Sequence, residues 1–270
     1  MTDVEVVGLG VWSESFANWD EFCLALDGTA RDTSPVLAPQ VIPAKERRRA
    51  PRSVKMAVEV MHQACRMAAL EPTGIATVFA SAIGDMNITD YMCRTLASAP
   101  RTISPTRFHN SVHNAATGYW SIATQSHAAA NAVSGFSSSV WIAILDGAIQ
   151  AVEEQIPVLV AAQEVAAPPP LDAIYDMAQP FAMALLLTPA GTCPKPLASM
   201  HLGISSDVVE SPPRAHVAGC DWSGNFAARS LPLLEALARH NDVKLQFPLS
   251  ASQSLSIAIA PDFQATQSGN

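Results

Sequence analysis

The sequence has few charged residues and no cysteine pattern typical of a metal site or a disulfide framework. Only 15% of the 270 residues are charged, and the formal net charge is −8, which argues against nucleic acid as the main ligand. The five cysteines are scattered, with no CxxC motif and no cysteine–histidine pairing. This distribution favours a reduced, cytoplasmic protein without structural zinc, and we expect neither a metal nor a cofactor.

Long apolar runs are also missing. No stretch reaches the roughly 20 apolar residues that a membrane span requires, and the N-terminus shows no basic region followed by an apolar run and a cleavage site. Hydrophobic residues nevertheless make up 49% of the chain, enough for a substantial core. The length suits one large α/β domain. We expect it over residues 1–262, followed by a disordered tail at 263–270.

Short apolar runs alternate with longer segments of helical period along the chain. The short runs predict strands and the periodic segments predict helices. Strands are expected at residues 4–10, 74–82, 129–133, 158–162, 181–188, 199–206 and 254–260. Helices are expected at 19–26, 53–70, 114–126, 137–152 and 231–240, with a mixed helix and loop at 85–99. This alternation predicts a mostly parallel mixed sheet with helices on both faces.

Two local features of the first half have simple interpretations. The first strand ends in Gly8-Leu9-Gly10, which lacks the third glycine of the dinucleotide-binding fingerprint and therefore predicts a tight turn. Ser53 precedes a helical stripe and is a candidate N-cap.

The centre of the chain, residues 114–152, carries the most informative pattern. A small apolar strand at 129–133 runs into a turn at 134–136, and serines 137–139 open a helix whose apolar stripe predicts burial. Such a helix directs free N–H groups and the positive end of its dipole into a crevice, where enzymes often hold a nucleophile. Here the turn carries serines and no cysteine.

Taken in order, these features resemble the β-ketoacyl synthases of the thiolase superfamily. The resemblance rests on residues 6–10 for the first strand, and on Asn114, Gly118 and residues 132–134 for the approach to the catalytic turn. It also covers the strand at 181–188 and a linker into the second half at 203–207. The resemblance implies a thiolase-like fold.

The family's nucleophilic cysteine is replaced in this chain. In an ungapped register it falls on Ser137, whereas a register through the serine run places Phe136 there. A helix end can ionise a thiol, but a serine hydroxyl needs a general base. The family's two catalytic histidines lie farther past the nucleophile than this chain extends, and no downstream histidine falls in a family-like motif: His201, His216 and His240. The resemblance thus implies a reduced C-terminal half without decarboxylation machinery.

A synthase-like chain without these groups is similar to the chain-length factors of type II polyketide and aryl-polyene systems. Those proteins pair with an active ketosynthase, extend its sheet across the dimer interface and shape the acyl pocket. The resemblance implies a ketosynthase partner and acyl-tunnel or interface positions at Met86, Ile88, Met92, Phe136, His109 and His113. An acidic acyl carrier protein would be a second partner, docking on a basic cluster: Arg47, Arg48, Arg49 and Arg52.

Other interpretations stay open. The methionines and Ile88 can be ordinary core, and the arginines can be a solvated surface. Ser137 can attack a thioester in a serine acyltransferase or thioesterase, with His109 or His113 as base and the helix start as oxyanion hole. Residues 135–139 also approach the G-x-S-x-G elbow of an α/β-hydrolase, with Asp207 and His216 or His240 as partners. A structural dimer without a partner enzyme is the last alternative.

Overall fold

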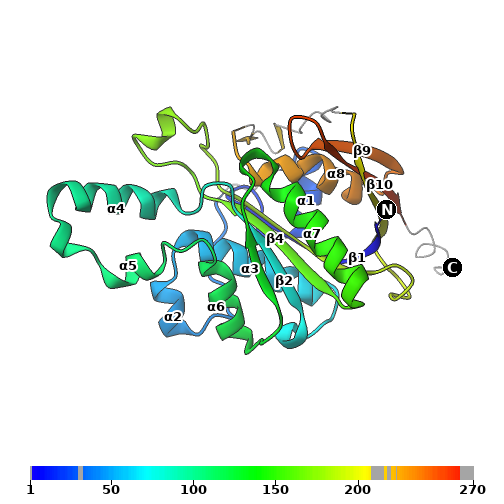
Figure 1. Ribbon diagram of the computed structural model, residues 1–270, viewed down its shortest axis with the longest axis horizontal. Helices are drawn as coiled ribbons and strands as arrows, with labels where there is room; N and C mark the ends of the chain where they lie inside the picture. Colours follow the sequence, from blue (N-terminus) through cyan, green and yellow to red (C-terminus); the bar gives the residue numbers. More distant parts are fainter. Residues whose placement is uncertain (1, 30–32, 208–215, 218–219, 223, 262–270) are drawn as a thin grey trace.

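The computed structural model describes residues 2–29, 33–207, 216–217, 220–222 and 224–261 (Figure 1). The expected tail at 263–270 lies outside these residues. An eight-stranded sheet forms the centre, with the strand order β3-β2-β4-β5-β1-β6-β10-β9. Its strands are β1 Thr2–Ser13, β2 Ala76–Ala80, β3 Ala130–Val133, β4 Val158–Glu164, β5 Phe181–Pro189, β6 Ala198–Ser205, β9 Val243–Pro248 and β10 Ser254–Pro261. A separate pair joins β7 His216–Val217 to β8 Cys220–Asp221.

Helices cover both faces of this sheet, as the sequence predicts. They are α1 Trp19–Leu26, α2 Ala44–Arg49, α3 Arg52–Met67, α4 Met86–Ser98, α5 Pro105–His109, α6 Ala115–Thr124, α7 Ser139–Glu154 and α8 Leu231–Ala238. Helix α3 packs on one face, against β1, β5 and β4, and α7 packs on the other, against β4, β2, β5 and β1. In Figure 1 the two helices lie on opposite sides of the central strands.

The mixed sheet flanked by helices is confirmed, but fewer strands are parallel than expected. Among the described strands of this sheet, only β2–β3 and β2–β4 pair in parallel. Strand β4 pairs antiparallel with β5, and the pairs from there to β9 are also antiparallel. A continuous apolar run indicates that a strand is buried on both faces, as β5 is because helices cover both of its sides. The run does not indicate whether the strand pairs in parallel or antiparallel.

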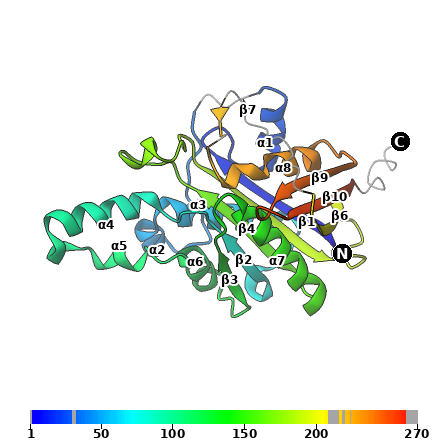
Figure 2. The same ribbon diagram turned by 45° about the horizontal axis from the view of Figure 1, so that its top comes forward.

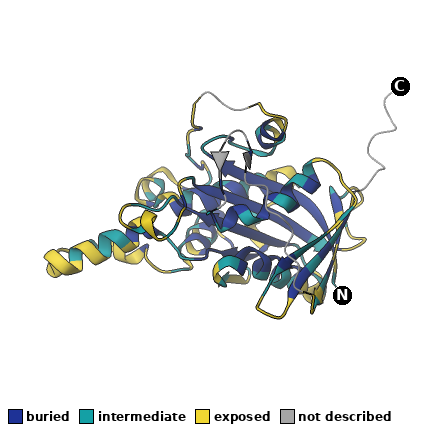
Figure 3. Ribbon diagram, turned by 90° about the horizontal axis from the view of Figure 1, so that it is seen from above, coloured by how far each residue is buried: buried dark blue, intermediate teal, exposed yellow. Residues whose placement is uncertain are grey.

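Strand β5 shows how the two cores are separated. Successive side chains point to opposite faces of a sheet. Accordingly Ala182, Ala184 and Leu186 belong to the core that contains α3. Met183, Leu185 and Leu187 belong to the core that contains α7. The apolar run at 181–188 therefore reflects a strand buried between two layers of helices. Figure 3 shows the central strands of the sheet as buried.

The glycines of the first strand do not form the predicted turn. Strand β1 continues through Gly8 and Gly10 to Ser13, and the two glycines let α3 approach the sheet closely. A Cβ on Gly10 would lie 2.0 Å from the carbonyl oxygen of Val60, and one on Gly8 would lie 2.1 Å from that of Ala64. The pair is therefore required for helix–strand packing.

Strand β3 is less buried than its composition predicts. It is the edge strand of the sheet, and its residues are exposed or half-buried. The N–H groups of Thr77 and Ser81 donate to the carbonyl oxygens of Ala129 and Val133, at 2.9 and 3.4 Å. Because backbone groups alternate in direction along a strand, residues 130 and 132 direct theirs away from β2. This edge is free in the described chain.

Helices α4 and α5 form an arm that extends from the body (Figures 1 and 2). The arm is held as a hairpin by Tyr91, whose hydroxyl accepts from the N–H of Ser104 at 2.9 Å. The guanidinium of Arg107 lies 4.0 Å above the Tyr91 ring. Leu96 and Phe108 are exposed on this arm, and Figure 3 shows most of it open to solvent.

The end of the chain builds more structure than the expected single helix and strand. Strand β9, Val243–Pro248, is not among the expected strands. Those expectations rest on continuous apolar runs, and polar residues interrupt this segment. Strands β6, β10 and β9 continue the sheet past β1, and α8 packs on β9 and β10. Buried residues of α8, β9 and β10 belong to the same core as α7.

Candidate functional site

The connection from β3 to α7 forms a sharp elbow at residues 134–138. A Cβ at Gly135 would lie 2.2 Å from Cδ1 of Ile142, so any larger residue there would require the Ile142 side chain to move. The N–H of Gly135 donates to Oγ of Ser139 at 3.0 Å, and the Ser139 hydroxyl donates to the carbonyl oxygen of Phe136 at 2.7 Å. These contacts fix the backbone at the start of α7.

The strained residue of this elbow is Phe136. Its φ is +51°, a value that is rare for residues other than glycine and costs on the order of 1–3 kcal/mol. Its side chain is 54% exposed, and its ring centroid lies 4.7 Å from that of Phe226. In nucleophile elbows the reactive residue sits at the strained position of a strand–turn–helix connection. The local geometry therefore favours the register that places Phe136, not Ser137, at the position of the family cysteine.

The hydroxyl of Ser137 makes no hydrogen bond to a general base in the described structure. Its side chain is half-buried. His113 is engaged elsewhere, with Nε2 lying 3.0 Å from the carbonyl oxygen of Val133. His109 ends α5 and lines a groove against α2 and α6. The serine-acyltransferase alternative, which needs such a base, stays a prediction.

The partners expected for a hydrolase triad are also dispersed. Asp207 follows β6, and its carbonyl oxygen accepts from the hydroxyl of Ser254 at 2.6 Å. His240 is exposed beyond the end of α8. The side chain of His216 lies outside the described residues.

The three candidate tunnel residues, Met86, Ile88 and Met92, lie on α4. The first two are at the start of this helix, where the arm joins the body, and Met92 is farther along it. Met86 and Ile88 are buried, whereas Met92 is half-buried. Asp85 caps this helix, accepting from the N–H groups of Asn87 and Ile88 at 3.0 and 3.1 Å. Met92 is therefore the one of the three with the most surface left for another molecule.

The basic cluster divides into anchored and free arginines. Arg47 donates to the carbonyl oxygen of Pro39 at 3.1 Å, and Arg52 pairs with Glu14. Arg48 and Arg49 are exposed on α2. Arg49 also lines a groove of about 520 Å³ between α2, α5 and α6, next to the exposed side chain of Ile122.

A buried carboxyl group that the sequence did not single out lies close to the elbow. Glu164 ends β4 and is 1% exposed. Its carboxyl group accepts from the hydroxyl of Ser81 at 3.2 Å and from the N–H of Ala82. Burial raises the pKa of Glu164 to about 8, and the charge of Asp85 adds to the rise. A single glutamate after an apolar run gives no sequence signal, because its partners are far away in the chain.

Two further classes of site find no support in the described part of the chain. No group of three or more histidine, cysteine, aspartate or glutamate side chains there could hold a metal ion. None of the helices described is long and apolar enough to cross a membrane.

The fold is that of ketosynthases. The structure is similar to a chain of the ketosynthase ApeO in complex with its chain length factor ApeC from Xenorhabdus doucetiae, with a TM-score of 0.72 and 18% identity over 96% of this chain and 99% of that chain. A β-ketoacyl synthase from Burkholderia phymatum gives a TM-score of 0.73 at 12% identity, over 97% and 100%. The ishigamide ketosynthase/chain length factor gives 0.71 at 12% identity, over 97% and 99%.

The sequence itself assigns the family. A comparison with curated protein sequences gives no match. The family model described as the N-terminal domain of β-ketoacyl synthase matches residues 19–217, well over half of the chain. With the thiolase-like architecture already established, this match shows that the chain belongs to the β-ketoacyl synthase N-terminal domain family.

Proposed function

We propose that this chain is a non-catalytic, ketosynthase-like subunit that pairs with an active β-ketoacyl synthase and shapes its acyl tunnel. It acts in the cytoplasm, in polyketide, aryl-polyene or fatty-acid-like biosynthesis. The observation that carries the proposal is the elbow, whose strained residue is Phe136. A phenyl ring cannot form a thioester, and the Ser137 hydroxyl makes no hydrogen bond to a base in the described structure.

Two features near the elbow suit a partner of the same fold. The free edge of β3 can extend a sheet into a second subunit, because its outward N–H and C=O groups have no partner strand in the described chain. The arm adds exposed apolar side chains at Leu96 and Phe108, and the turn after α5 adds Val112. A ketosynthase solved in complex with its chain length factor has the same fold, which supports this pairing.

The tunnel is shaped by side chains on the arm and at the elbow. Met92 is half-buried and flexible, so it can adapt to an acyl chain. Met86 and Ile88 support it from the buried root of the helix. Phe136 presents an exposed ring, and His109 and His113 complete the interface.

The carrier protein docks on the basic helix α2. Arg48 and Arg49 are exposed and available to an acidic surface, whereas Arg47 and Arg52 hold the cluster in place through their own contacts. Charge complementarity of this kind mainly accelerates association.

Co-expression with a full-length β-ketoacyl synthase from the same genome tests the proposal. Native mass spectrometry should detect a one-to-one heterodimer, and the pair should make a product that the synthase alone does not make. Ser137→Ala should leave that product unchanged. A chain that stays monomeric and leaves the product unaltered, or that condenses acyl thioesters unaided, contradicts the proposal.

A further inference from the structure

The ring of Phe136 at the elbow packs on a ring from the second half of the chain. Phe226, in the segment that leads into α8, has its ring centroid 4.7 Å from that of Phe136, and the two planes are inclined by 49°. This is a favourable arrangement for an aromatic pair. Phe136 is exposed and Phe226 is half-buried. Among the described aromatic rings, only that of Phe226 packs on Phe136.

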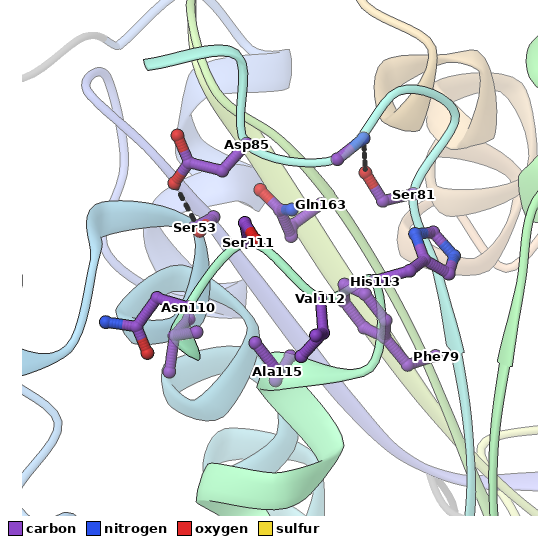
Figure 4. Close-up of a pocket in the computed structure, with 13 residues that line it drawn as sticks. Ser53, Phe79, Ser81, Asp85, Asn110, Ser111, Val112, His113, Ala115 and Gln163 are labelled. Atoms are coloured by element: carbon purple, nitrogen blue, oxygen red, sulfur yellow. Dashed lines mark hydrogen bonds between the residues drawn. The ribbon is translucent and has the colours of Figure 1, made fainter. Parts of the chain in front are cut away.

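The first half of the chain holds the backbone of the elbow but not its exposed ring. The hydroxyl of Ser134 donates to the carbonyl oxygen of Ala82, in the turn after β2, at 3.0 Å. Nε2 of His113 lies 3.0 Å from the carbonyl oxygen of Val133, and Figure 4 shows the His113 ring close to that of Phe79 in β2. These contacts fix the chain at the end of β3 and do not involve the ring that follows.

Asn225 fixes the backbone next to Phe226. Its side chain is 1% exposed, and its amide nitrogen donates to the carbonyl oxygen of Gln179 at 2.8 Å. Its amide oxygen accepts from the N–H groups of Ala227 and Ala228 at 3.0 and 3.1 Å, as the side chain of an N-cap does. Such a buried amide holds its segment in one position, because breaking these hydrogen bonds would leave polar groups unpaired.

Gly224 and Trp222 hold the same segment on its N-terminal side. A Cβ at Gly224 would lie 1.5 Å from the carbonyl oxygen of Asp176, so this glycine lets the segment pack directly on the loop between β4 and β5. Trp222 is buried, and its ring packs on those of Phe16 and Phe181, with centroids 5.6 and 6.0 Å away. The ring beside the elbow therefore projects from a segment that is held at several points.

We propose that Phe226 is a positioning residue of the elbow, which holds the ring of Phe136 in one orientation. The second half of this chain thereby takes part in shaping the acyl tunnel, and this consequence rests on the proposed function. Without Phe226, the exposed ring of Phe136 would be free to turn into another rotamer, and the space left for an acyl chain would change. Phe226 lies beyond residues 19–217, which match the family model, so the family match does not imply its role.

Fluorine NMR of the full chain labelled with 4-fluorophenylalanine tests the contact without a partner. The signal of Phe136 is assigned by its loss in Phe136→Leu. Phe226→Ala and Phe226→Leu should both shift that signal, because the neighbouring ring is gone, and the leucine variant keeps the apolar volume if the alanine variant does not fold. Phe226→Tyr keeps the ring and should leave the signal in place. Phe108→Ala, which removes an exposed ring from the arm, is the matched control and should also leave it in place.

Co-expression with a full-length β-ketoacyl synthase tests the consequence for the tunnel. Phe226→Ala should alter the distribution of product chain lengths. The double variant with Phe136→Ala should alter it no further than Phe136→Ala alone, because Phe226 acts through Phe136. A purely structural role would instead lower the yield and leave the distribution as it is. Phe226→Tyr should give the wild-type distribution.

A Phe136 signal that stays in place in both the alanine and the leucine variant of Phe226 overturns the inference. A wild-type product distribution with Phe226→Ala overturns it as well, and the proposed function still stands if Phe136→Ala changes the product. If the two proteins form no heterodimer, the proposed function is contradicted, and the fluorine signal decides whether Phe226 positions Phe136.

Discussion

Trp141 and Phe247 stack face to face, with ring centroids 3.5 Å apart and planes inclined by 11°. Trp141 lies in the first turn of α7 and Phe247 lies in β9, more than a hundred residues later. Both rings are buried. The contact joins the elbow helix to the strands at the end of the chain.

Removing one ring of this stack should destabilise the fold. We expect Phe247→Ala to lower the free energy of unfolding by about 3–5 kcal/mol, because a large cavity would remain beside α7. Ile204→Ala, on an exposed position of β6, should change it by less than about 0.5 kcal/mol. Urea denaturation followed by tryptophan fluorescence measures both. If Phe247→Ala and Ile204→Ala unfold at the same urea concentration, the contact between β9 and α7 does not stabilise the fold.

Glu164 should make stability depend on pH. Its pKa is raised from 4.5 to about 8 in the folded chain, so between these values the folded state binds more protons than the unfolded state. Stability from this group is therefore full below about pH 4.5 and falls as the pH rises toward 8. One pKa unit corresponds to about 1.4 kcal/mol, so the loss amounts to several kcal/mol.

Glu164→Gln removes that titration. The variant keeps an oxygen that can accept from the N–H of Ala82 and the hydroxyl of Ser81. We expect the slope of unfolding free energy between pH 5 and 8 to become clearly shallower than in the wild type. Urea unfolding at unit pH intervals measures the slope, and an unchanged slope would show that Glu164 ionises normally.

Thiol reactivity can decide which residue occupies the nucleophile position. Phe136 is strained and exposed, so a cysteine there would project from the elbow near the positive end of α7. We expect the thiol of Phe136→Cys to react with iodoacetamide at pH 7 about tenfold faster than that of Ser137→Cys, because the helix end lowers its pKa. Peptide mass spectrometry separates these thiols from the native ones, and exposed Cys93 serves as reference. The opposite order would favour the ungapped register.

The free edge of β3 should be part of the subunit interface. Ala132→Pro removes an N–H that points away from β2, so it leaves the pairing of β2 with β3 in place. We expect at least a tenfold weaker heterodimer with the ketosynthase. Ala132→Val keeps the N–H and should bind as the wild type does, with circular dichroism confirming that both variants fold. Tight binding by the proline variant would exclude this edge from the interface.

Apolar periodicity was enough to locate most of the sheet and its helices. Residues 158–162 and 181–188 fall within β4 and β5, and residues 19–26 coincide with α1. Such runs are visible because burial on both faces requires continuous apolar character. Strand β9 is not among the expected strands, because polar residues interrupt its apolar ones and only Phe247 of the strand is buried.

Contacts between distant segments could not be predicted in the same way. Ser53 was expected to cap α3, but Pro51 is the N-cap and the Ser53 hydroxyl contacts Asp85 across 32 residues. Likewise, the choice between Phe136 and Ser137 depends on a backbone dihedral that residue types do not encode. The sequence pattern locates the elbow, but it does not decide which of the two residues takes the nucleophile position.

The path of the sheet also has a consequence for α7. Strands β4, β2, β5 and β1 pack against this helix, and buried residues of β9 and α8 belong to the same core. The elbow is therefore held by a scaffold from a single polypeptide. A designer could therefore replace the exposed side chains at the elbow without altering the strands that hold it.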